Sequence, residues 1–313
     1  MNDRVAMSTY EFMRRFSSER EARSYIENCR WHGSPTCPKC GAASRIQTRK
    51  IEGYYRCLSC KGDFTVRTGT IFERSHVPLD KWLCAVYLLV TARKGISSLQ
   101  LSKEIGVTQK TAWFMLAKLR KACGNDNDSL LSGIIEADET FLGGKEVDKH
   151  ESKKQHTGRG SVGKTPLLGM HERSGSSGRT KASVAEKVKV DDNTIKSYVE
   201  RQISPGSDFY TGEHAAYKSA AGLNHQSVNH SAKQFIDGIA HTNGIESVWA
   251  VLKRGFYGTY HHFILIHTQG YVDEFTFRLN EGSVKEITMG RIGVLLGKNI
   301  GVRVTYARLA ADR

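Results

Sequence analysis

Two pairs of cysteines near the start of the sequence constrain this chain more than any other feature. Cys37 and Cys40 form one C-x2-C pair, Cys57 and Cys60 form a second, and 16 residues separate the two pairs. Four thiolates at this spacing can surround one tetrahedral Zn²⁺ ion, and a site closed by four protein ligands is structural. The pattern predicts a zinc ribbon with short strands at 43–47, 53–56 and 63–67. Disulfide bonds are the alternative, which the lack of a secretion signal disfavours.

The charge balance points to a polyanionic partner. Lys plus Arg number 46 and Asp plus Glu 32, so the formal net charge is +14. A chain this basic is expected to bind nucleic acid. The longest apolar run, residues 85–90, is far shorter than the ~20 residues that cross a bilayer. We therefore expect a cytoplasmic, nucleoid-associated protein with no membrane partner.

Residues 98–113 resemble a helix-turn-helix. Gly106 suits the left-handed turn between two short helices, and Thr108 can cap the second helix. The exposed positions of that second helix are expected to include Gln109, Lys110 and Lys118. Glutamine can read adenine edges and lysine can neutralise phosphate, so the segment is predicted to bind DNA. A helical hairpin that only packs on its neighbours is the alternative.

A polar segment at 124–128 lacks periodicity and is the expected linker. Beyond it, strand patterns alternate with helix patterns, which predicts an α/β core. Strands are expected at 134–135, 167–170 and 208–211, and helices at 193–203, 244–256 and 270–280. We expect four parts: an N-terminal helix with the ribbon at 1–75, the helix-turn-helix segment at 76–123, an α/β domain at 130–285 and a C-terminal tail at 286–313.

Two acidic residues far apart in the sequence occupy positions that suggest chemistry. An apolar strand ends near Asp138, and Glu136 lies on the same face of that strand. A later amphipathic helix carries Glu246, with Lys253 two turns further on the same side. Taken singly, Asp138 could be a turn former, and Glu246 could form a capping box with Asn243.

Several motifs together resemble those of one family. They lie at 65–72, 136–141, 158–160, 246–254, 258–262 and 273–278. With the ribbon and the helical segment, they make nearly the whole chain similar to the zinc-ribbon insertion-sequence transposases with an ISXO-type DDE domain. The resemblance implies a multidomain α/β protein: a zinc ribbon, a helix-turn-helix segment and an RNase H-like mixed-sheet catalytic domain.

The resemblance also implies an activity. Such a transposase binds double-stranded DNA at the terminal inverted repeats of a mobile element and at its target, and acts as a homo-oligomer in a synaptic complex. It cuts and joins strands with two Mg²⁺ or Mn²⁺ ions, held by two Asp and one Glu, which activate the attacking oxygen and stabilise the leaving oxygen. By motif position, Asp138 and Glu246 correspond to the first and third acids, and Lys253 to a basic residue that steadies DNA.

The second acid is missing from its expected place. The resemblance implies an Asp at the end of strand 208–211, where this chain has Gly212. Asp208 lies about 13 Å upstream at ~3.3 Å per residue. Glu213 is expected to point across the sheet, and it reaches the site only if the strand ends early. We therefore expect an impaired transposase. The alternative is a non-catalytic DNA-binding protein, either a decayed transposase or a regulator.

Residues 158–165 match G-x4-G-K-[ST], the phosphate-binding loop of nucleotide hydrolases. That loop requires a buried strand before it and a helix after it, whereas basic and polar residues precede this segment and Pro166 follows it. The basic residues around it are instead expected to form an arm that follows the DNA backbone. They include Lys153, Lys154 and Arg159.

Overall fold

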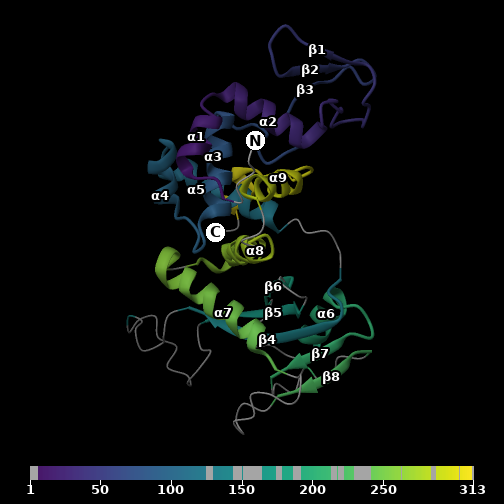
Figure 1. Cartoon of the computed structure of the whole chain (residues 1–313), viewed down its shortest axis with the longest axis vertical. Helices are drawn as coiled ribbons and strands as arrows, with labels where there is room; N and C mark the ends of the chain where they lie inside the picture. The colour runs from purple at the N-terminus through teal and green to yellow at the C-terminus, as the bar shows by residue number, and fades with distance from the viewer. Residues whose placement is uncertain are drawn as a thin grey trace. The chain divides into compact units, whose positions relative to one another are not determined.

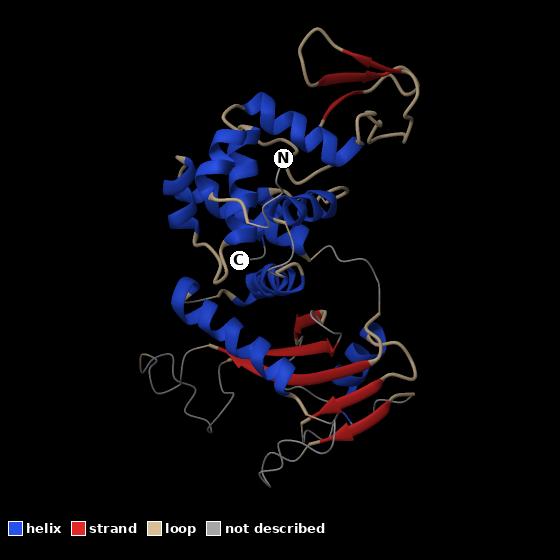
Figure 2. Cartoon of the chain, viewed as in Figure 1, coloured by secondary structure: helices blue, strands red, loops and turns tan. Residues whose placement is uncertain are grey.

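The computed structural model divides the chain into two compact units (Figures 1 and 2). Unit 1 consists of Met1–Asp126 and Glu281–Arg313, and unit 2 of Asn127–Asn280. The structure describes residues 6–124, 130–143, 150, 164–173, 178–185, 192–212, 217, 222–228, 241–261, 263–282, 287–302 and 304–311, without the side chains of 192–194, 308, 310 and 311.

The N-terminal part of unit 1 contains a small antiparallel sheet in the order β1-β2-β3. Its strands are β1 (Ile46–Thr48), β2 (Tyr54–Cys57) and β3 (Asp63–Thr65). The ring of Trp31, the last residue of a preceding helix, lies edge-on to Tyr55 and Phe64 at centroid distances of 5.3 and 5.9 Å. These aromatic contacts attach the sheet to the helical part of the unit.

The rest of unit 1 is helical. Its helices are α1 (Thr9–Arg15), α2 (Glu19–Trp31), α3 (Leu79–Thr91), α4 (Ser98–Ile105), α5 (Gln109–Cys123), α9 (Thr288–Lys298) and α10 (Tyr306–Ala311). The turn between α4 and α5 has the expected geometry: Gly106 is left-handed at φ 62°, and the Thr108 side chain accepts a hydrogen bond from the backbone of Thr111. A Cβ-free residue suits that backbone conformation.

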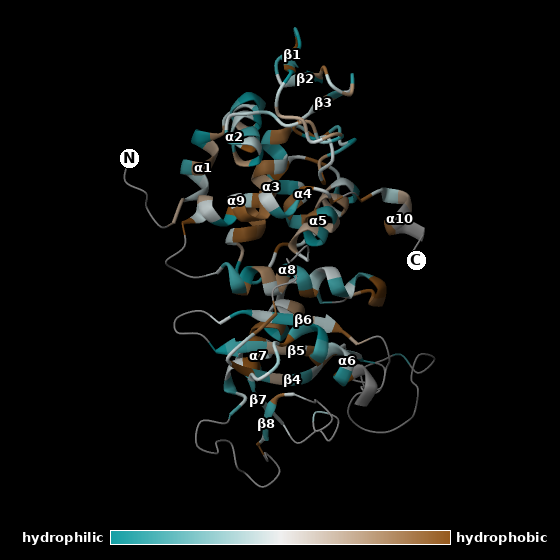
Figure 3. Cartoon of the chain, turned by 90° about the vertical axis from the view of Figure 1, so that its right-hand side faces the viewer, coloured by the Kyte–Doolittle hydropathy of each residue, from teal (hydrophilic) through white to brown (hydrophobic). Residues whose placement is uncertain are grey.

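The C-terminal segment differs from the expected tail. Helix α9 packs beside α2 and α3 (Figures 1 and 3), and its Ile292, Leu295 and Leu296 are buried. The backbone N–H of Gly301 also donates to the carbonyl of Gly69 at 2.9 Å. Both ends of the chain therefore build unit 1, and the ribbon and the helix-turn-helix share it.

Unit 2 is built on a five-stranded mixed sheet in the order β6-β5-β4-β7-β8. The strands are β4 (Ile134–Leu142), β5 (Thr165–Arg173), β6 (Thr180–Val184), β7 (Asp208–Thr211) and β8 (Asn224–Ser227). β4, β5 and β6 pair antiparallel, whereas β7 and β8 continue from β4 in parallel. This is the mixed sheet that the family resemblance implied.

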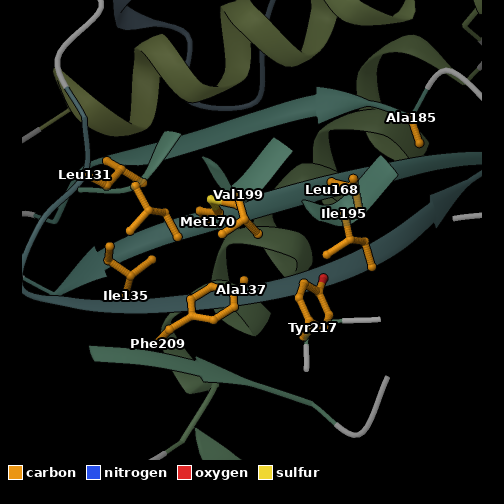
Figure 4. Close-up of a cluster of buried hydrophobic side chains, with 11 residues drawn as sticks. Leu131, Ile135, Ala137, Leu168, Met170, Ala185, Ile195, Val199, Phe209 and Tyr217 are labelled. Carbon is orange, nitrogen blue, oxygen red and sulfur yellow. The ribbon is translucent and has the colours of Figure 1, made fainter. Parts of the chain in front are cut away.

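Helices cover both faces of the sheet, because its strands carry apolar residues on both sides. On one face, α6 (Asp192–Gln202) packs on the cluster drawn in Figure 4, which includes Ile135, Ala137 and Phe209. On the other face, α7 (Asn243–Gly255) and α8 (Thr268–Asn280) bury a second cluster. α7 runs on into a π-helical turn, Phe256–Tyr260, and a short helix, Leu265–His267, precedes α8.

Side-chain amides of α8 protect the β6 edge of the sheet. Gln269 accepts from the backbone N–H of Val184 at 2.8 Å, and Asn280 accepts from Thr180 N–H at 2.7 Å. Asn280 also donates to the Thr180 carbonyl at 2.9 Å. An exposed edge would present these groups to other chains, so the two amides both satisfy the edge and block further strand pairing.

Candidate functional site

The four cysteines of the ribbon form a compact cluster. Their sulfur atoms all lie within 4.8 Å of one another, with Cys37 Sγ 3.7 Å from Cys60 Sγ and Cys40 Sγ 3.6 Å from Cys57 Sγ. A tetrahedral Zn²⁺ with Zn–S bonds of ~2.3 Å requires sulfur separations of about 3.8 Å. The cluster therefore fits a structural Zn²⁺ ion, and its cysteines are free of disulfide bonds.

The two halves of this cluster have the same backbone geometry. The N–H of Cys37 donates to the carbonyl of Ala42, and the N–H of Cys57 donates to the carbonyl of Gly62, both at 2.9 Å. Hydrogen bonds from the backbone of Cys60 and Ser59 lower the pKa of the Cys57 thiol to about 6. Those hydrogen bonds favour the thiolate, the form that binds metal.

In unit 2, Asp138 lies on the face of β4 that α7 covers. Burial raises the pKa of its carboxyl to about 7, and repulsion from Glu139 and Glu246 adds to the effect. Among the described residues, no Lys, Arg or His forms an ion pair with Asp138. A partly buried carboxylate crowded by other acids is a site that a cation would stabilise.

Glu246 projects from the first turns of α7 toward this region. Its side chain is exposed, and Oε1 accepts from the Thr242 hydroxyl at 2.8 Å. The helix begins at Asn243 with Thr242 as N-cap, so Glu246 is the fourth helical residue. The capping-box interpretation of Asn243 with Glu246 is therefore wrong, because that motif needs the acid at the third position.

Glu136 supplies the missing cap from another element. It is 1% exposed, and its Oε2 accepts from the backbone N–H of Ile245 at 2.9 Å. Its Oε1 pairs with Arg173 Nε at 2.5 Å, and Arg173 also donates to the carbonyl of His241 at 2.7 Å. We call Glu136 and Arg173, with the α7 start they bind, the helix anchor.

Gly244 allows this close approach. A Cβ at that position would stand 2.8 Å from Glu136 Oε2 and 2.7 Å from a ring carbon of His171. The helix anchor therefore fixes the start of α7 against β4 and β5. Asp138 is on β4, two residues after Glu136, and Glu246 directly follows Ile245, whose backbone N–H binds Glu136. The helix anchor therefore also fixes the positions of the Asp138 and Glu246 backbones relative to each other.

The sheet register places Gly212 beside Asp138. β4 pairs with β7 from Ile134↔Asp208 to Ala137↔Thr211, and one further step aligns Asp138 with Gly212. A Cβ on Gly212 would meet nothing within 4 Å, and its φ is not positive. Asp208 is at the other end of the strand, where it accepts from Asn224 at 3.1 Å. Glu213 lies outside the described residues.

The remaining expected site residues have mixed outcomes. Lys253 is half-buried on α7, two turns after Glu246. Gln109 and Lys110 are exposed at the start of α5. Lys118 is only 3% exposed and donates to the carbonyl of Ile71 at 2.7 Å and of Glu73 at 3.3 Å. The prediction that Lys118 is an exposed DNA contact is therefore wrong. Lys153, Lys154 and Arg159 lie outside the described residues.

Sequence reasoning missed the roles of Arg173 and His241. The sequence indicated only that Glu136, an acid on a buried strand, needs a cationic or hydrogen-bonding partner, and did not indicate which residue that partner is. The pairing of β5 with β4 identifies the partner, since it puts Arg173 on the same face of the sheet as Glu136.

The fold and these sites define a class of protein: a zinc ribbon joined to an α/β domain with a carboxylate-bearing sheet face. Two family models match the chain. Residues 17–62 match a transposase zinc-ribbon domain and residues 130–280 an ISXO2-like transposase domain. The chain belongs to the IS1595-type zinc-ribbon transposases. It is also 28% identical, over 252 residues, to an uncharacterized protein in transposable element ISH50 of Halobacterium salinarum, covering 76% of this chain and 83% of that relative.

Membership of this family implies that the protein binds DNA. No helix in the described part of the chain is both long enough and apolar enough to span a bilayer.

Proposed function

We propose that the protein binds the terminal inverted repeats of its insertion sequence and carries out metal-dependent cleavage and transfer of DNA strands. The observation that carries this proposal is the meeting of Asp138 and Glu246 on one face of unit 2. They come from β4 and α7, which the hydrogen bond from Ile245 N–H to Glu136 joins two residues before Asp138 and one before Glu246, and repulsion from Glu246 adds to the raised pKa of Asp138. Two carboxylates close together, one of them partly buried, make a site that divalent ions would stabilise.

The residues present suit Mg²⁺ or Mn²⁺. Both ions prefer carboxylate oxygens and keep several water ligands, so a partly solvated pair of acids is an appropriate donor set. Asp138 and Glu246 would hold the metal. The bound ions would supply activation of the attacking oxygen and stabilisation of the leaving oxygen.

The chain's own groups would then position the DNA. Lys253 follows Glu246 by two turns on α7, a rise of ~10 Å, which suits contact with a backbone phosphate next to the reacting one. The exposed Gln109 and Lys110 at the start of α5 would contact bases and phosphates. Two DNA ends must meet for transfer, so we expect a homo-oligomer, acting on the nucleoid in the cytoplasm.

The proposed activity is impaired because Gly212 replaces an acid. Two carboxylates hold a metal pair less tightly than three, and a Cβ on Gly212 would meet no other group within 4 Å. A non-catalytic DNA-binding protein is the second candidate, and the same glycine is the observation that favours it.

Cleavage of DNA carrying the element's terminal repeats, with Mg²⁺ or Mn²⁺, tests the proposal. We expect weak cleavage by the natural chain and much stronger cleavage after Gly212→Asp, because a Cβ fits there without strain. Gly212→Asn is the matched control, since it adds the same bulk without the charge.

Loss of the residual cleavage in Asp138→Ala and Glu246→Ala would support the metal site. Repeat binding without cleavage in both the natural chain and Gly212→Asp would favour the non-catalytic candidate. Strong cleavage by the natural chain would refute the impairment.

A further inference from the structure

The indole of Trp249 packs on the sheet at Gly169, next to Asp138. Gly169 on β5 is the direct cross-strand partner of Asp138. A Cβ on Gly169 would overlap with both Cζ2 and Cη2 of Trp249, so only a residue without a side chain leaves room for this ring. Directly opposed residues in an antiparallel pair have Cβ positions about 5 Å apart. The ring edge next to Nε1 is therefore adjacent to Asp138.

The indole N–H is buried without a satisfied hydrogen bond. Trp249 is 4% exposed, and its Nε1 has no partner of normal hydrogen-bond geometry among the described residues. A buried N–H left unpaired costs about 1–3 kcal/mol. Asp138 is the acidic residue beside this ring edge, because it is the direct cross-strand partner of Gly169, against which the ring packs.

Trp249 and Glu246 are also neighbours on α7. They are three residues apart, which places them on one side of a helix. The same helix therefore brings a carboxylate and an N–H donor to Asp138, and the helix anchor at Glu136 holds both in place.

We infer that Trp249 is a positioning residue for Asp138: its indole N–H donates to the carboxylate oxygen that does not bind the metal. This inference rests on the proposed function, since it assigns a supporting role at the same metal site. Carboxylates that bind metals are commonly held by such hydrogen bonds, and their loss typically weakens metal affinity roughly 10- to 100-fold. Donation to that oxygen would satisfy the buried N–H of Trp249, which has no other partner among the described residues.

The test uses the zinc-loaded full chain and Trp249→Phe, which keeps an apolar ring and removes the donor. Mn²⁺ titration measures affinity, and Tb³⁺ luminescence excited through tryptophan reports an indole next to the bound ion. We expect about tenfold weaker Mn²⁺ binding in the variant, together with loss of the sensitised Tb³⁺ emission. Trp82→Phe, which removes a buried indole N–H in unit 1, should change neither signal.

A second replacement separates the hydrogen bond from the fit of the ring. Benzothienylalanine at position 249 has sulfur in place of the indole N–H and nearly the same shape. It should weaken Mn²⁺ binding as Trp249→Phe does, with an unchanged melting temperature.

Two outcomes are distinguishable. Mn²⁺ binding that is lost in Asp138→Ala but equal to the natural chain in both Trp249 replacements would overturn the role of Trp249 alone. Mn²⁺ and Tb³⁺ binding that is indifferent to Asp138→Ala, in the natural chain and in Gly212→Asp, would overturn the proposed metal site and this inference with it.

Discussion

Replacing Glu136 by glutamine should loosen the start of α7. The glutamine side chain would keep an oxygen for the Ile245 N–H but lose the charge that faces the helix N-terminus and Arg173. The anchor would then hold α7 by neutral hydrogen bonds only. Because the substitution is nearly isosteric, it tests the charge rather than the fit of the side chain.

The expected cost follows from three contributions. Exchanging a charged for a neutral acceptor at Ile245 N–H costs about 1 kcal/mol, and losing an anion at a buried helix N-terminus costs up to about 2 kcal/mol. Arg173 is 21% exposed, so water compensates part of its lost partner and this contribution is about 1 kcal/mol. The sum is about 2–4 kcal/mol.

Hydrogen exchange of the Ile245 amide is the direct assay. At about 1.36 kcal/mol per factor of ten, exchange by local opening should accelerate about 30- to 900-fold. Glu172→Gln is the matched control, because Glu172 forms a more exposed pair with Arg179 at 2.9 Å and should change exchange little. Ile245 exchange within a factor of three of the natural chain would refute the charged anchor.

Three further predictions concern other parts of the molecule. Lys118→Met should destabilise unit 1 by about 2 kcal/mol in a thermal melt and leave the salt dependence of DNA binding unchanged, whereas Lys110→Ala should reduce the salt slope by about one and leave the melt unchanged. Equal effects of the two on DNA binding would contradict the burial of Lys118. Gly169→Ala should destabilise unit 2 by about 1–3 kcal/mol because its Cβ meets an indole ring, while Gly297→Ala in α9, where the space is open, should stabilise unit 1 by about 0.5 kcal/mol. If neither substitution changed the free energy of unfolding in urea, the predicted clash between a Cβ at position 169 and the Trp249 ring would be refuted. Mn²⁺ affinity should rise about tenfold per pH unit up to about pH 7 and then level off, because protons compete for Asp138 until its pKa of about 7 is passed. The folded-state pKa exceeds the unfolded value of 3.8, so this group makes the metal-free unit less stable as pH rises toward 7. A pH-independent Mn²⁺ affinity, measured by calorimetry, would rule out Asp138 as the ligand.

Local features of the fold were predictable because they depend on nearby residues. The left-handed Gly106, the Thr108 cap and the strand at β7 follow from turn chemistry and apolar spacing. Strand β8 was missed because its sequence, Asn-His-Gln-Ser, has no apolar pattern, and only pairing with β7 defines it. Helix α9 was missed because the partners that bury it lie some 200 residues earlier in the chain.

Roles for residues of the candidate site could be predicted only by their positions in motifs that resemble those of the family. Those positions provided the predicted roles of Asp138, Gly212 and Glu246, which stay predictions. Nothing in the local sequence indicated that Glu136 would cap α7, since those elements are more than 100 residues apart. The Lys118 error was avoidable. It follows Gln109 by nine residues, and at ~100° per residue that is half a turn, so the two side chains face opposite sides of α5.

The return of the C-terminal segment to unit 1 has a consequence for synthesis of the chain. Helix α9 begins at Thr288, well after the last described strand of unit 2 ends at Ser227, so it is synthesised after the described strands of that unit. A product truncated before that helix leaves the apolar side of α3 without its cover, even though it contains the whole ribbon and the complete α4–α5 pair. The part of the protein encoded first therefore cannot complete its helical core until α9 has been made, and a premature stop anywhere upstream of α9 leaves that core incomplete.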